Sequence, residues 1–134
     1  MTTTINASPT NGLVQTADGS GIVKLQSNGV ATNALAWVNF NGSDGSRNSS
    51  YNVTSVTRNG TGDYTVTFTI AMADANYVST GSGRRNSATA RPQVFTQRTS
   101  PYENTTTTSR FLVWCDAAAA QEDPLMFYFV VFGN

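Results

Sequence analysis

The sequence contains no histidine, a single cysteine and few charged residues, and each shortage excludes a class of chemistry. Without histidine, Ser-His-Asp and Cys-His nucleophilic catalysis, histidine metal sites and histidine acid–base chemistry are excluded. The lone cysteine, Cys115, rules out an intramolecular disulfide, and its apolar surroundings suit synthesis in a reducing cytoplasm. The sequence also lacks an apolar run long enough to cross a bilayer, so we expect no membrane insertion.

The few charged residues are evenly balanced, with eight basic and eight acidic side chains. A protein of zero net charge lacks the general attraction that supports nucleic-acid binding, so no nucleic-acid partner is expected. The acidic residues are scattered, and most occur in turn contexts, where aspartate is a preferred residue. We interpret them as turn formers and caps and not as a hydrolase pair. Asn41–Ser46 is rich in side chains that carry oxygen atoms, but it lacks the alternating acidic ligands of a calcium loop. We therefore expect no enzyme activity, metal or cofactor.

What the sequence does contain is typical of a small β-sheet protein. Its 134 residues fit one domain, and Leu, Ile, Val and Phe make up only about a fifth of them. The polar residues are mainly Thr, which suits the wet face of a strand, and Asn and Ser, which suit turns. Small domains with thin cores are often stabilised by oligomerisation, so we expect an oligomer.

Asn-Gly and Asp-Gly pairs divide the chain into short segments rich in β-forming residues, and these pairs suit hairpin turns. The clearest strand is Asp63–Ile70, where four apolar residues alternate with three threonines. It should pair with residues 51–57 through a hairpin at 58–62. The remaining expected strands are 21–27, 34–40, 110–115 and 125–132. This spacing predicts an all-β fold, an antiparallel β-sandwich or small barrel.

Two regions of the chain are expected to differ from this pattern. Residues 1–33 form a turn-rich N-terminal arm or attachment segment, and residues 34–134 form the β-sandwich domain. Within that domain, 80–90 and 99–109 are predicted loops. Residues 116–124 are the only candidate for a helical turn, capped by Asp116 and stopped by Pro124.

The last strand, 125–132, is apolar on both faces. A strand of this kind is either central in a sheet or covered by another subunit. Because the chain is poor in core residues, we predict a partly intersubunit location. Phe127, Phe129 and Val131 are the candidate residues of a trimer interface.

Arginine is concentrated between residues 84 and 110, a segment that contains five arginines and only one acidic residue. Such a set can dock on an acidic partner or hold carboxylate or phosphate groups of a surface polysaccharide. The other interpretation is solvated loop charges paired within the trimer. Trp37 and Trp114 are expected in the core, whereas Tyr77 and Tyr102 flank polar stretches and are better ligand candidates. The candidate partner-binding residues are Arg84, Arg85, Arg91, Arg98, Tyr102 and Arg110.

Several segments resemble a domain that recurs in bacteriophage virion proteins, often at the C-terminal tip of tail fibres. The resemblance lies in residues 36–42, 50–56, 59–68, 71–77 and 130–133, and the opening 1–29 is similar to the N-termini of marine phage structural proteins. It implies a trimeric β-sandwich on the virion surface, synthesised in the cytoplasm of the bacterial host, since Met1–Ile5 lacks the features of a signal peptide. It implies no catalytic residues.

The chain is too short for a tail fibre with an attachment domain and a shaft. A free module with a short arm is better suited to a decoration (cement) protein that binds the major capsid protein and stabilises the phage head. The alternative is a receptor-binding tip or knob, associated with tail proteins, that binds a host cell-surface polysaccharide.

Overall fold

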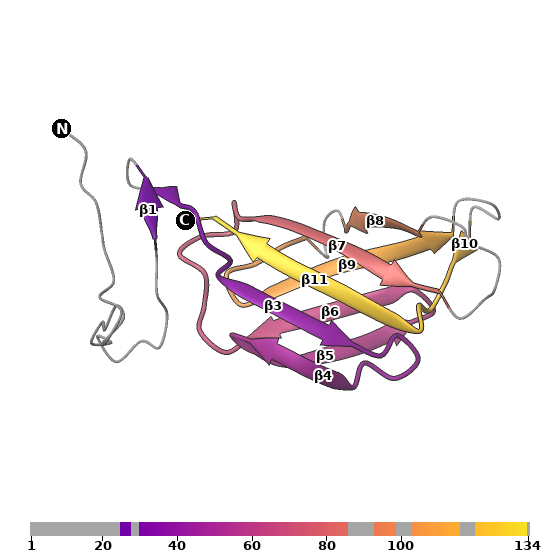
Figure 1. The fold of residues 1–134 in the computed structure, drawn as a ribbon. Helices are drawn as coiled ribbons and strands as arrows, with labels where there is room; N and C mark the ends of the chain where they lie inside the picture. The colour runs from indigo at the N-terminus through magenta and orange to yellow at the C-terminus, as the bar shows by residue number, and fades with distance from the viewer. Residues whose placement is uncertain (1–24, 28–29, 86–92, 99–102, 116–119, 134) are drawn as a thin grey trace, which may run out of the picture.

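The computed structural model describes residues 25–27, 30–85, 93–98, 103–115 and 120–133 (Figure 1). The strands, in chain order, are β1 (Gln26–Ser27), β2 (Val30–Ala31), β3 (Ala36–Phe40), β4 (Arg47–Tyr51), β5 (Val53–Gly60), β6 (Asp63–Phe68), β7 (Val78–Arg84), β8 (Gln93–Gln97), β9 (Thr108–Cys115), β10 (Ala120–Gln121) and β11 (Met126–Phe132). None of the described residues is helical, so no helix among them could span a membrane. The prediction of an antiparallel all-β fold is confirmed.

Strands β3 to β11 form two antiparallel sheets that lie face to face as a sandwich, and β1 and β2 pair separately (Figure 1). The first sheet has the order β4-β3-β11-β7, and the second has the order β10-β9-β6-β5, with β8 also paired to β9. The chain passes from one sheet to the other after β4, β6, β7 and β10. The last strand, β11, consequently lies in the middle of the first sheet, between β3 and β7.

The alternation predicted for residues 63–70 is confirmed over β6. Tyr64, Val66 and Phe68 are buried, and the hairpin with β5 forms as expected. Ile70 departs from the prediction because β6 ends at Phe68, and 36% of its side chain is exposed.

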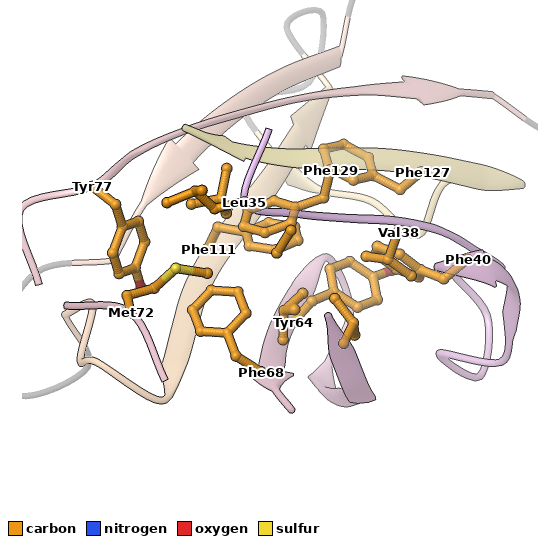
Figure 2. Packing of buried hydrophobic residues seen from close by; sticks show 14 of the residues in the cluster. Leu35, Val38, Phe40, Tyr64, Phe68, Met72, Tyr77, Phe111, Phe127 and Phe129 are labelled. Atoms are coloured by element: carbon orange, nitrogen blue, oxygen red, sulfur yellow. The ribbon is translucent and has the colours of Figure 1, made fainter. Parts of the chain in front are cut away.

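The core between the sheets is built mainly from aromatic rings (Figure 2). Phe129 and Phe111 stack with ring centroids 5.0 Å apart and an interplanar angle of 8°. Phe127, Phe129 and Val131 are exposed by 1%, 2% and 0%, so they pack inside their own chain. Their predicted place in a trimer interface is therefore wrong: β11 is central, and these three side chains face the second sheet.

Among the described residues, the predicted turn is confirmed after β3, but the turn after β5 falls two residues later than predicted. Asn59-Gly60 ends β5, and the left-handed conformation of the following turn falls on Gly62, at φ 65°. The turn between β3 and β4 contains both predicted pairs, Asn41-Gly42 and Asp44-Gly45, and its positive φ falls on Gly45, at 76°. The Asn41 Oδ1 atom instead accepts a hydrogen bond from the Ser43 N–H at 2.9 Å. Asparagine can support a turn by adopting a positive φ or by accepting a hydrogen bond with its side chain, and Asn41 does the second.

Strand β7 was predicted to be largely loop, because Ser79–Gly83 contains no large apolar residue. Its inward positions include Gly81 and Gly83, which lie against the ring of Phe127. A Cβ atom at Gly81 would meet the Phe127 Cζ atom at 2.7 Å, so the ring occupies the space of the missing side chain. The glycines of β7 thus let this strand complete the sheet, because they leave room for the Phe127 ring of the adjacent strand β11.

The remaining expectations concern segments that are described only in part. Residues 120–121 form β10 and pair with β9, so the helical turn predicted for 116–124 is wrong there, and 116–119 lie outside the described residues. Most of the predicted arm, residues 1–24 and 28–29, is also outside them. Its described part contains the short hairpin β1–β2.

Candidate functional site

The outer face of the first sheet exposes aromatic side chains from its two central strands. Trp37 on β3 and Tyr128 and Phe132 on β11 are exposed by 39%, 44% and 39%. Because side chains alternate along a strand, these residues point away from the core that Val38 and Phe129 enter. The face therefore carries large rings at positions where the wet side of a sheet usually carries polar residues.

A groove with a volume of about 500 Å³ lies on this face. The outward-facing residues that line this outer groove are Trp37, Asn39, Ser49, Thr80, Ser82, Tyr128 and Val130. The sheet register brings them together. Tyr128 is paired with Asn39 on β3 and with Ser82 on β7. Trp37 and Thr80 lie in the adjacent row, on either side of Val130.

The outer groove presents aromatic and uncharged polar groups together. Its residues supply two exposed rings, one amide and, with that of Tyr128, four hydroxyl groups, and none of them is charged. Amides and hydroxyls can each donate and accept hydrogen bonds, whereas tyrosine and tryptophan combine an apolar body with a polar group. Among the described residues, those that line the groove include no Asp, Glu, Lys, Arg or Cys.

Sequence reasoning missed both rings. Trp37 was expected in the core, yet it is on the opposite face of β3 from the buried Ala36, Val38 and Phe40. The alternation of side chains along β3 in the sequence already places Trp37 on the face opposite Ala36, Val38 and Phe40. The sequence likewise shows that both faces of the last strand are apolar. Trp114, the other tryptophan, is half-buried.

Tyr77 was expected to be a ligand residue, but it is a core residue, exposed by only 6%. Its hydroxyl donates a hydrogen bond to the backbone, with the Thr108 carbonyl oxygen at 2.8 Å. Burial raises the pKa of Tyr77 to about 12. Tyr102, the other tyrosine ligand candidate, lies outside the described residues.

The candidate arginines do not form one surface. Arg98 and Arg110 converge on Asp63, with Nη2–Oδ2 distances of 3.2 Å and 2.7 Å. Arg85 pairs with Glu122 through Nε, 2.8 Å from Oε1. Arg84 is exposed, and Arg91 lies outside the described residues. Arg85, Arg98 and Arg110 are thus each paired with an acidic residue of the same chain.

The carboxylate of Asp63 is held as an anion by these contacts. The hydrogen bond from Arg110 lowers the pKa of Asp63 below its ordinary value, against the opposing effect of burial. The site joins three segments, because Asp63 begins β6, Arg110 lies on β9, and Arg98 follows β8. It ties these three segments together.

A second carboxylate, the half-buried Asp123, ties the connection before β11 to the β5–β6 hairpin. It receives hydrogen bonds from Arg58, from the Gly62 N–H at 2.9 Å and from the Tyr64 hydroxyl at 2.7 Å. Burial raises the pKa of Asp123, but these hydrogen bonds lower it by more, so it lies below its ordinary value. Burial, together with the bond to Asp123, raises the pKa of Tyr64 far above its ordinary value. The hydroxyl therefore remains a donor and cannot serve as a base.

Comparisons of this chain with protein-family models, with curated proteins and with solved structures found no match.

Proposed function

We propose that this protein is a non-enzymatic structural component of a bacteriophage virion surface, and that the outer groove makes its contact with a host-surface ligand. The observation that carries the proposal is the exposure of Trp37 and Tyr128 beside hydroxyl and amide groups on one sheet face. Exposed aromatic patches on small proteins mark binding sites. The virion setting is supported by the sequence resemblance to phage virion domains.

A binding role fits the state of the acidic groups better than a catalytic one. Asp63, Glu122 and Asp123 are each engaged by an arginine of the same chain, and the pKa values of Asp63 and Asp123 are lowered. A general acid needs a pKa near the operating pH, which the lowered values of these two carboxylates oppose.

Of the two virion roles considered, the groove favours the receptor-binding tip. Small-ligand sites are concave and combine apolar walls with a few placed polar groups. The core of a protein–protein interface is instead depleted in serine. The outer groove is hollow and presents Ser49, Thr80 and Ser82 as exposed residues.

The decoration role on the major capsid protein is the second candidate, and a different observation favours it. Val78 and Phe132 form a cross-strand pair at one end of the same sheet, exposed by 65% and 39%. Neither lines the outer groove, and an apolar pair of this kind suits a protein neighbour. The same pair is available to a homotrimer contact, which we propose for either role because the core is thin.

Location and copy number in purified phage particles test the proposal. A labelled antibody against the chain should mark the tail, and quantitative mass spectrometry should count a few copies per particle. Hundreds of copies spread over the head would favour decoration and reject the tip. Absence of the chain from purified particles would reject a virion role altogether.

A further inference from the structure

We infer that the outer groove binds an uncharged sugar residue, stacked on Trp37 and Tyr128 and hydrogen-bonded by the surrounding amide and hydroxyl groups. This inference deepens the proposed receptor-binding role and rests on it. It also changes the class of ligand, since the arginine-rich segment had pointed to an acidic polysaccharide.

The two rings are placed for stacking. Trp37 pairs with Val130, and Tyr128 is two residues before Val130 on β11, so the rings are diagonal neighbours on adjacent strands. Diagonal neighbours on one face lie about 7–8 Å apart at their Cα atoms, within reach of aromatic side chains. The C–H face of a pyranose ring is apolar and can cover such rings, while its hydroxyls point outward to polar neighbours.

The polar groups around the rings match sugar hydroxyls in kind. Asn39 and Ser49 lie on one side of Tyr128, and Ser82 lies on the other, in a row across the four strands. Hydroxyl and amide groups both donate and accept, as sugar hydroxyls do. A sugar bound in this row would meet hydrogen-bonding groups on both sides of the aromatic ring.

The absence of charge from the groove lining selects against acidic ligands. A carboxylate or phosphate that loses its water needs a cation or several strong donors in compensation. Among the described residues, none that lines the groove is a cation, and the exposed Arg84 lies two residues beyond Ser82 on β7, outside this lining. Arg85, Arg98 and Arg110 already pair with acids of the chain. An uncharged ligand is therefore complementary to the uncharged residues of this lining.

Direct binding measurements test the inference. The full chain is titrated with neutral hexose and N-acetylhexosamine oligosaccharides, and with polygalacturonate as the acidic comparison, following calorimetry and tryptophan fluorescence. We expect saturable binding of at least one neutral oligosaccharide with a change in fluorescence, because Trp37 lies in the groove. Binding should be nearly constant between about 0.05 and 0.5 M NaCl, since no charges meet.

Variants identify the groove as the site. Trp37→Ala and Tyr128→Ala should each weaken binding about tenfold or more, as expected for an anchoring ring. Phe132→Ala is the matched control: it removes an equally exposed ring from the same face, outside the groove lining, and should leave binding unchanged. Far-ultraviolet circular dichroism and the urea midpoint establish that each variant folds.

The other outcomes are distinct. Tighter binding of polygalacturonate, or equal losses in all three variants, would overturn the inference. If no neutral oligosaccharide binds and Trp37→Ala instead lowers the oligomeric mass by light scattering, the face is covered by a second copy of the chain. Failure to bind sugar while the chain is found at the phage tail rejects the ligand class alone. Sugar binding by a chain absent from phage particles rejects the virion role alone.

Discussion

Strand β11 has aromatic rings on both a buried and an exposed face. Replacing one ring on each face with alanine measures how much more the buried ring contributes to the free energy of unfolding. Phe129 is exposed by 2% and stacks on Phe111, whereas Phe132, three residues later, is exposed by 39%. Truncation of a buried phenylalanine to alanine costs about 3–5 kcal/mol, including the cavity that remains. Because β11 is held by strands on both sides, the cavity cannot collapse easily, and we expect about 4 kcal/mol for Phe129→Ala.

Urea unfolding followed by circular dichroism is the assay. With a denaturant slope of about 2 kcal/mol per molar, Phe129→Ala should lower the midpoint by about 2 M. The control Phe132→Ala should cost less than about 1 kcal/mol. If Phe129→Ala is too unstable to purify, Phe129→Leu should cost about 1.5 kcal/mol in the same assay.

Protein concentration separates the core from a subunit interface. A residue buried within one chain shifts the midpoint by the same amount at about 1 and about 100 µM protein, whereas an interface residue does not. A loss below about 1.5 kcal/mol for Phe129→Ala would refute the placement of this ring in the core. The placement would also be refuted if the difference in urea midpoint between Phe129→Ala and the parent protein changed with protein concentration.

Two further predictions concern the internal polar groups. Tyr64→Phe keeps the buried ring but removes the donor to Asp123, so it should cost about 1–2 kcal/mol in urea unfolding; a cost indistinguishable from zero would contradict the hydrogen bond. The pKa values of Asp63 and Asp123 are lower in the folded chain than in the unfolded chain, so their stabilisation is complete above about pH 4 and is lost as the pH falls through the folded values. The urea midpoint should therefore drop in acid, and Asp63→Asn should be less stable at pH 7 yet lose less on acidification; an equal acid loss would count against this reasoning.

Regular alternation made the strands of the central hairpin predictable. The threonines of β6 mark one face of the sheet and its apolar residues mark the other, and this local signal survives folding unchanged. The prediction failed where a strand lacks apolar side chains of its own. The inward face of β7 is completed by Phe127 from β11, more than forty positions away in the sequence, and no local pattern carries that information.

The site was harder to foresee for a related reason. The clustering of arginines along the sequence suggested a surface, but pairing is decided by which strands become neighbours. Asp63 meets Arg110 because β6 and β9 are adjacent. The outer groove likewise depends on β4, β3, β11 and β7 lying side by side, since each strand contributes only one to three of its residues.

The glycines of β7 also decide where this protein can be rebuilt. To an engineer choosing a place for a peptide tag or a new chain terminus, Ser79–Gly83 has the composition of a flexible linker. In the fold it is a wall that holds the Phe127 ring in place along one of its sides. An insertion there would open the interior to water and displace Thr80 and Ser82 from the outer groove. The segment that looks most dispensable is thus one of the least replaceable.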